Sequence, residues 1–117
     1  MLAKEYRLKG QKNFDRILKS PNTTRGQFLY IKFINNDLAI TRFGLVVSNK
    51  ISPKATKRNY IRRSLRQIIV ESRKDIKSGF DIILLAKNNI IDAKLNDLRE
   101  DLKKLLIQIK ILNYQNV

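Results

Sequence analysis

The chain has 117 residues, of which 43% are hydrophobic, and its 25 Lys and Arg residues against 10 Asp and Glu give a formal net charge of +15 at pH 7. This length predicts one domain, residues 1–117, with one modest core, and the charge predicts an acidic partner. Cysteine and histidine are absent, which excludes disulfides, zinc-finger chemistry and an imidazole base. No apolar stretch approaches the roughly 20 residues that span a bilayer, so we expect a cytoplasmic protein without a membrane partner.

The first predicted element is a short helix over Gln11 to Lys19. Its apolar residues recur at helical spacing, and Pro21 follows as a stop signal. These apolar positions are Phe14, Ile17 and Leu18. A short additional strand is expected near Thr23.

Two longer strands are predicted next. Gln27 to Ile34 alternates between two faces. One face holds Leu29, Ile31 and Phe33, and the other holds Phe28 and Tyr30. Residues 35–37 predict a turn, and Leu38 to Val47 predicts the second strand. Because only this turn separates the two strands, we expect them to form a hairpin.

The second half of the chain predicts a helix, a strand and a last helix. Ser52-Pro53 favours a helix start, since proline is tolerated in a first turn, and this helix is expected to run to about Ile76. Phe80 to Ala86 is nearly continuously apolar, which is typical of a strand buried on both faces. Asp92 is expected to cap the last helix, whose apolar stripe comprises Leu95, Leu98, Leu102, Leu105, Leu106 and Ile109. The predicted order is αββαβα, or αβββαβα with the short strand near Thr23.

Positive charge is concentrated in the middle of the chain. No acidic residue lies between Asp37 and Glu71, where the basic residues are Arg42, Lys50, Lys54, Lys57, Arg58, Arg62, Arg63 and Arg66. On the predicted helix Arg58, Arg62 and Arg66 form an i, i+4 row with a spacing of about 6 Å, which can follow the phosphates of a nucleic acid. A basic helix face is most often simply solvated, but solvated faces normally mix both signs. The segregation therefore favours nucleic-acid binding, with RNA or DNA left open by charge alone.

Other functional classes fit less well. A metal-dependent nuclease needs several carboxylates around one or two cations, whereas Glu71/Asp75 and Asp97/Asp101 are spaced as ordinary surface pairs on helices. We therefore expect no catalytic residue and no metal ligand. A helix-turn-helix DNA binder needs two adjacent helices, but strands are predicted on both sides of the basic helix. A ribosomal protein stays an alternative, because proteins with a sheet, a basic helix and this charge are common in ribosomes.

Two adjoining segments resemble the protein subunit of bacterial ribonuclease P. The first is Phe43-Gly44-Leu45-Val46-Val47-Ser48-Asn49-Lys50, and the second is Ala55-Thr56-Lys57-Arg58-Asn59-Tyr60-Ile61-Arg62-Arg63-Ser64-Leu65-Arg66. They are similar to that family's strand end and to the Arg-Asn-Arg stretch that follows it, in the same order. The resemblance extends from Arg7-Leu8-Lys9 to the leucine-rich last helix.

The resemblance implies an α/β fold, an α+β two-layer sandwich that is ribosomal protein S5 domain 2-like, in the order αβββαβα with a left-handed βαβ crossover. It implies the accessory subunit of an endoribonuclease that removes the 5′ leader from precursor tRNA. The RNA subunit would perform the chemistry with Mg²⁺, while the isolated protein would have no active site and no bound cofactor. The expected partners are the catalytic RNA, bound 1:1 by a monomer, and precursor tRNA.

The resemblance also assigns residues to the two RNA partners. The catalytic RNA would contact Lys54, Lys57, Arg58, Asn59, Arg62, Arg63 and Arg66. The leader would bind in a cleft between the first helix and the sheet, lined by Phe14, Leu18, Leu29, Ile31, Lys50 and Arg58. For Leu18, Leu29 and Ile31, the pattern fits a position in the core equally well.

The sequence departs from the family in two places. Tyr60 occupies the third position of the Arg-Asn-Arg stretch, where one guanidinium contact is missing or replaced by aromatic stacking. Leu18 and Ile31 stand where family members often carry aromatic residues. Phe33 shares the predicted face of Ile31 and could supply the aromatic, while Tyr30 points to the other face, so the aromatic that meets the leader stays open.

Overall fold

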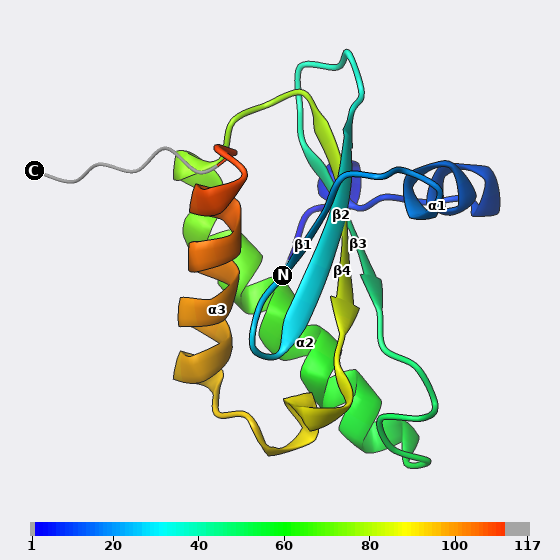
Figure 1. Ribbon diagram of the computed structural model, residues 1–117, viewed down its shortest axis with the longest axis vertical. Coiled ribbons are helices and arrows are strands. Elements are labelled where there is room, and N and C mark those ends of the chain that lie inside the picture. Colours follow the sequence, from blue (N-terminus) through cyan, green and yellow to red (C-terminus); the bar gives the residue numbers. More distant parts are fainter. Residues whose placement is uncertain (1, 112–117) are drawn as a thin grey trace, which may run out of the picture.

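The computed structural model describes residues 2–111, which fold as a mixed sheet with helices on both faces (Figure 1). Its strands are β1 (Thr23–Arg25), β2 (Leu29–Asn35), β3 (Arg42–Val46) and β4 (Phe80–Ala86). Its α-helices are α1 (Gln11–Leu18), α2 (Ala55–Ser72) and α3 (Leu95–Gln108), with short 3-10 turns at Lys4–Tyr6, Arg73–Asp75 and Asn88–Asp92. The predicted α/β class and the order αβββαβα are confirmed.

β4 lies inside the sheet, which has the order β1-β2-β4-β3. It pairs antiparallel with β2 and parallel with β3. The predicted hairpin between β2 and β3 is therefore wrong, because β4 separates them. A strand that is apolar on both faces buries more surface at the centre of a sheet than at its edge. β2 instead forms an antiparallel pair with the short β1, and α2 connects β3 to β4.

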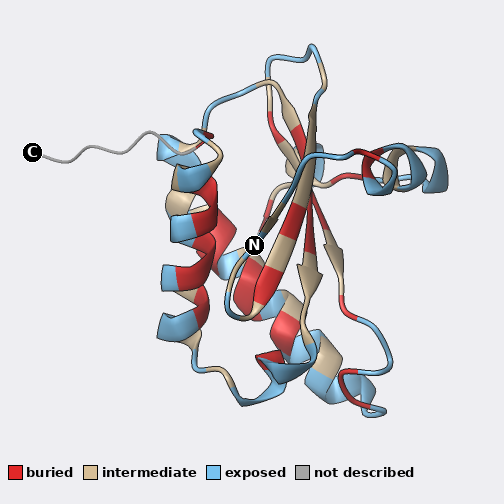
Figure 2. Ribbon diagram, viewed as in Figure 1, coloured by how far each residue is buried: buried red, intermediate tan, exposed pale blue. Residues whose placement is uncertain are grey.

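The main core lies between one face of the sheet and the helices α2 and α3. Figure 2 shows the buried residues of both helices on the sides that face the sheet. The helices contribute Ile61, Leu65, Ile68, Ile69, Leu98, Leu102, Leu105 and Leu106, and the strands contribute Leu29, Ile31, Ile82 and Leu84. The leucine stripe of the last helix thus faces the core, as its spacing predicts.

α1 packs on the opposite face of the sheet and covers only part of it (Figure 1). Leu8, Ile17 and Ile83 are buried there, and Phe14 and Leu85 pack partly buried against them. Among the eight residues of α1, only Ile17 is fully buried. The sheet face beside α1 therefore retains accessible side chains.

Two helix starts differ from the predictions. α2 begins at Ala55 rather than at Ser52-Pro53, because the Ser52 hydroxyl accepts the backbone N–H of Lys54 at 3.2 Å and holds the chain in a turn before the helix. Asp92 lies in a 3-10 turn and does not cap α3. The N-cap residue is Lys94, and Asp97, the third residue of the helix, accepts the backbone N–H of Lys94 at 3.3 Å. No helix in residues 2–111 is long and apolar enough to cross a membrane.

Candidate nucleic-acid interface

α2 turns an apolar side to the core and a basic side to solvent. Ile61, Leu65, Ile68 and Ile69 are no more than 5% exposed. The arginine row lies half-buried along the border of the core and comprises Arg58, Arg62 and Arg66. The outer positions are exposed and comprise Lys54, Lys57, Asn59, Tyr60 and Arg63. The residues predicted to contact a catalytic RNA therefore share one continuous surface on α2 and its N-cap.

Within residues 2–111, no carboxylate neutralises the arginine row. Arg58 Nη1 donates to the carbonyl of Ser52 at 2.8 Å, and Arg62 Nη1 donates to Asn59 Oδ1 at 3.0 Å. The ion pairs of this part of the chain involve other arginines, namely Arg16, Arg42 and Arg99. The row thus keeps its positive charge, as the acid-free segment predicts.

A hollow of about 290 Å³ lies where α1 and the N-terminal segment approach the arginine row. Arg7, Lys9, Arg62 and Arg66 contribute to its lining, and no described acidic residue does. Partial burial and, after it, the charges of Arg7 and Arg62 lower the pKa of Arg66. Concentrated positive charge in a concave, partly desolvated site favours an anion.

Phe14 forms the apolar part of this hollow, and its position depends on Gly44. A Cβ at residue 44 would lie 2.6 Å from Cζ of Phe14, far inside van der Waals contact. Glycine at this position of β3 therefore lets the ring lie directly against the strand backbone. The structure thus brings Phe14 next to Arg62 and Arg66.

The residues predicted to bind the leader divide between the two faces of the sheet. Phe14 is half-buried on α1, Leu18 is 37% exposed at the end of α1, and Lys50 is exposed after β3. Leu29 and Ile31 are 0% exposed in the main core, beneath α2 and α3. They cannot line a cleft on the α1 face, so their assignment to the leader is corrected, and the alternative of a core position holds.

Tyr30 is the aromatic residue of β2 on the α1 face. In the sheet it is paired with Arg25 of β1 and Leu85 of β4, and the Arg25 guanidinium lies 5.7 Å from its ring centroid. Phe33 packs against the main core instead. The alternation along β2 is as predicted, but the face that meets α1 is the one that carries Tyr30.

Sequence reasoning did not single out Arg7, Lys9 or Tyr30 as site residues. Arg7 and Lys9 flank the buried Leu8, a basic-apolar-basic alternation that places both charges on the same side of an extended segment. That pattern is a usable signal once Leu8 is known to be buried. In the described part of the chain, no three His, Cys, Asp or Glu side chains gather in a way that could hold a metal ion.

A central buried strand, a helix with an uncompensated arginine row and a second sheet face half-covered by α1 define a class of small basic α/β proteins with a concave cationic surface. The sequence matches the family model described as Ribonuclease P over residues 2–110. The chain belongs to the ribonuclease P protein family, as the motifs in its sequence predict.

Relatives and solved structures agree with this assignment. The ribonuclease P protein component of Picosynechococcus sp. is 31% identical over 112 residues, covering 96% of this chain and 97% of the relative. That of Thermoanaerobacter sp. strain X514 is 31% identical over 108 residues, covering 92% of each. The RNase P protein of Staphylococcus aureus superposes with a TM-score of 0.84 at 28% identity, covering 92% of this chain and 98% of the other. That of Thermotoga maritima gives 0.80 at 28% identity, covering 87% and 96%.

Proposed function

We propose that the chain is the RNA-binding subunit of a ribonuclease P ribonucleoprotein and assists a catalytic RNA in removing the 5′ leader from precursor tRNA. The main support is the basic side of α2, whose arginine row is not neutralised by any carboxylate within residues 2–111. Family membership supports the ribonuclease P assignment. In this proposal the RNA performs the cleavage and the protein supplies binding surfaces.

The basic side of α2 is the proposed contact with the catalytic RNA. Arginine suits this role because its planar guanidinium donates two parallel hydrogen bonds to a phosphate and also stacks on bases. The contacts are Lys54, Lys57, Arg58, Asn59, Arg62, Arg63 and Arg66. Tyr60 is 57% exposed between them, so it can stack on an unpaired base where the family pattern has a guanidinium.

The α1 face of the sheet is the proposed contact with the single-stranded leader. Stacking on aromatic rings and a positively charged groove are the usual means of holding a single strand. Phe14, Leu18 and Tyr30 supply the apolar and aromatic surface, and Lys50 and Arg58 supply charge at its border. Arg7 and Lys9, in the hollow beside Phe14, extend the charge toward α1.

The remaining parts of the proposal follow from the ribonucleoprotein. Mg²⁺ would be held by the RNA, since phosphates and water are its usual ligands. One monomer would bind one catalytic RNA and one precursor tRNA, in the cytoplasm. Positive charge from the protein would lower the Mg²⁺ needed for cleavage, because both screen phosphate repulsion.

Reconstitution tests the proposal directly. The chain is combined with a bacterial ribonuclease P RNA, and cleavage of precursor tRNA is measured at limiting and at saturating Mg²⁺. We expect the protein to restore cleavage at limiting Mg²⁺ and to give none without the RNA. Cleavage at the mature 5′ end by the protein alone would overturn the proposal.

A pair of variants links the effect to α2. Arg62→Ala is expected to weaken binding to the catalytic RNA by about 1–3 kcal/mol, as the loss of a charge-assisted contact does. Lys103→Ala removes one charge from an exposed position on α3 and serves as the control. Equal losses for the two variants would mean that net charge, rather than the surface of α2, determines binding.

A further inference from the structure

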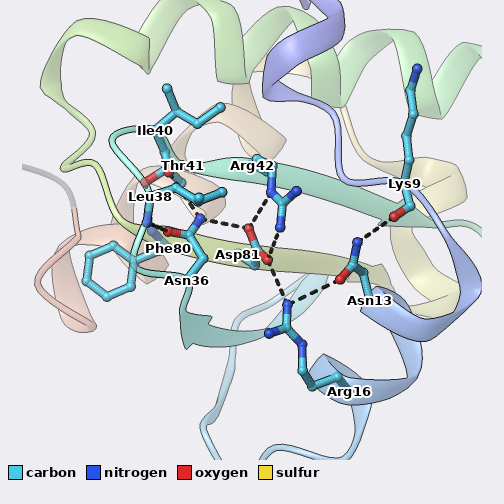
Figure 3. Close-up of polar contacts among 10 residues, drawn as sticks. All are labelled: Lys9, Asn13, Arg16, Asn36, Leu38, Ile40, Thr41, Arg42, Phe80 and Asp81. Atoms are coloured by element: carbon cyan, nitrogen blue, oxygen red, sulfur yellow. Dashed lines mark hydrogen bonds and ion pairs between the residues drawn. The ribbon is translucent and has the colours of Figure 1, made fainter.

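A buried carboxylate on β4 connects the sheet to α1. Asp81 is 0% exposed and faces the α1 side of the sheet. It accepts hydrogen bonds from Arg42 Nε at 2.8 Å, Arg42 Nη2 at 2.7 Å and Asn36 Nδ2 at 2.8 Å. Its remaining contact is with Arg16 Nη2 of α1, at 3.1 Å (Figure 3).

Arg42 is the main cationic partner of this carboxylate, to which it donates two hydrogen bonds. Burial by itself would raise the pKa of Asp81, but the hydrogen bonds from Arg42 and Asn36 and the charges of both arginines lower it below its ordinary value. Two guanidinium groups therefore share a single carboxylate. The second guanidinium, from Arg16, is 51% exposed, so its role is not simply to neutralise a buried charge.

The Arg16 contact extends along α1 to the start of the helix. Arg16 Nη2 also donates to Asn13 Oδ1 at 3.3 Å, and Asn13 Nδ2 donates to the carbonyl of Lys9 at 2.8 Å (Figure 3). Hydrogen bonds thus run from Lys9 through Asn13 and Arg16 to Asp81. The polar face of α1 is tied to the sheet by a directional link, while the apolar face rests on nondirectional packing.

Apart from this link, α1 is held by the packing of Phe14 and Ile17 and by hydrogen bonds that flank the helix, from Leu8 N–H to the Phe43 carbonyl and from the Ser20 hydroxyl to the Phe33 carbonyl. Helices shorter than about 12–15 residues are marginal alone, and α1 has eight residues with no side-chain N-cap. Phe14, two positions before Arg16, must meet the backbone of Gly44 closely. A small tilt of α1 would lift the Phe14 ring from this contact and open the hollow beside Arg62 and Arg66.

We infer that Arg16 and Asp81 are positioning residues that hold α1 at the angle at which Phe14 meets a single-stranded leader. The inference rests on the proposed function, in which Phe14 contacts the leader. Neither residue needs to touch RNA, because their effect passes through the placement of α1.

The free protein provides the first test. The Phe14 ring lies against Gly44, so its ring current shifts the α-proton resonances of Gly44 in the NMR spectrum. Arg16→Met is expected to move these resonances toward ordinary glycine values. Lys12→Met, one turn earlier on α1 and exposed, removes the same charge and is expected to leave them in place. Unchanged Gly44 resonances in Arg16→Met would overturn the inference.

Binding provides the second test. Arg16→Met is expected to weaken the affinity of the holoenzyme for precursor tRNA by about tenfold, since small misplacements of a binding group are costly. Its affinity for mature tRNA, which lacks the leader, is expected to stay the same. Lys12→Met is expected to change both affinities by at most about twofold, as loss of an exposed charge does. Equal losses for the two variants, or equal losses for precursor and mature tRNA, would overturn the inference.

Two controls separate the possible failures. Because the Arg16 side chain is half-exposed and Arg42 still pairs with Asp81, Arg16→Met is expected to fold, which circular dichroism checks. Arg16→Lys keeps a cation that can reach Asp81 and is expected to restore much of the precursor preference and the Gly44 shift. A parent holoenzyme that binds precursor and mature tRNA equally would overturn the proposed leader contact as well, whereas the Gly44 measurement does not depend on RNA.

Discussion

Replacing Arg66 by methionine is expected to separate stability from RNA binding. In the free protein Arg66 is partly buried, and Arg7 and Arg62 repel it, which together lower its pKa. Methionine keeps an unbranched stem of similar shape, so packing along α2 is retained while the charge is removed. A like-charge pair at i, i+4 on a helix, such as Arg62 and Arg66, costs about 0.2–0.5 kcal/mol, and a similar cost is assumed for Arg7 and Arg66. With two such contacts relieved, the free energy of unfolding is expected to stay the same or to rise by up to about 1 kcal/mol.

The same substitution is expected to weaken binding to the catalytic RNA. A charge-assisted hydrogen bond to phosphate is worth about 1–3 kcal/mol, roughly a 5- to 150-fold change in Kd. If Arg66 neutralises one phosphate, the slope of log K against log salt should fall in magnitude by about 0.9. The stability of the free protein is thus expected to stay the same or to rise, while its affinity for the catalytic RNA is expected to fall.

Two measurements on the same variant check this expectation. Urea denaturation gives the free energy of unfolding, and filter binding over a salt series gives the affinity and its slope. Gln67→Met changes the next, exposed position of α2 without removing charge, and is expected to bind RNA as the parent does. A loss of stability in Arg66→Met together with parental affinity and slope would refute the assignment, because Arg66 would then be a structural residue.

Three further changes test the fold around the interface. Gly44→Ala would place a Cβ 2.6 Å from Cζ of Phe14. We therefore expect thermal denaturation to show a loss of about 1–3 kcal/mol in stability, and the preference for precursor over mature tRNA to be smaller. An unchanged preference would contradict the placement of the ring. Asp101→Asn alters a buried carboxylate that accepts the backbone N–H groups of residues 27–29 at 2.8–3.1 Å, and should cost about 1–3 kcal/mol in urea denaturation; parental stability would show that the turn does not need it. Because the pKa of Asp81 is lowered in the folded state, its contribution to the free energy of unfolding is complete above the ordinary value of about 3.9 and is lost as the pH falls through the lowered value. Asp81→Asn should therefore flatten the acid limb of a stability profile measured from pH 2 to pH 6, and a limb as steep as the parent's would assign the acid sensitivity to other groups.

Helices and strands are predicted here by local periodicity, but strand pairing is not a local property. The turn at residues 35–37 favours a hairpin, and nothing in the adjacent sequence reveals that a strand from residues 80–86 lies between β2 and β3. The deciding feature is the composition of β4, whose Ile82 and Leu84 fill the main core while Ile83 is buried beneath α1. A strand that is buried on both faces belongs at the centre of a sheet, and applying this rule to β4 would have argued against a hairpin of β2 and β3.

The faces of β2 show a second limit. A period of two assigns Tyr30 and Ile31 to opposite faces, yet both faces carry apolar residues, so alternation alone does not say which one meets α1. The exposure of each face depends on how much of it the helices cover. α2 and α3 bury Leu29 and Ile31 completely, whereas α1 is too short to bury Tyr30. The solvent side of α2 could be predicted from the sequence, because a helix with one apolar side has only one side left for charge.

The positions of the acidic residues differ from those that would neutralise the basic surface of α2. Asp81 pairs with Arg16 of α1, Glu71 pairs with Arg99 of α3, and Asp101 accepts hydrogen bonds from the turn before β2, so these acids connect different elements of the fold. The first turn of α2 has no acidic residue, although the helix dipole favours one there. Lys54 and Lys57 stand in its place, so the dipole and the neighbouring charges both oppose them. A phosphate is the group that would relieve the two effects at once, since it accepts hydrogen bonds from free backbone N–H groups and from basic side chains. In the proposed function, binding of RNA to the start of α2 would relieve this unfavourable placement of charge.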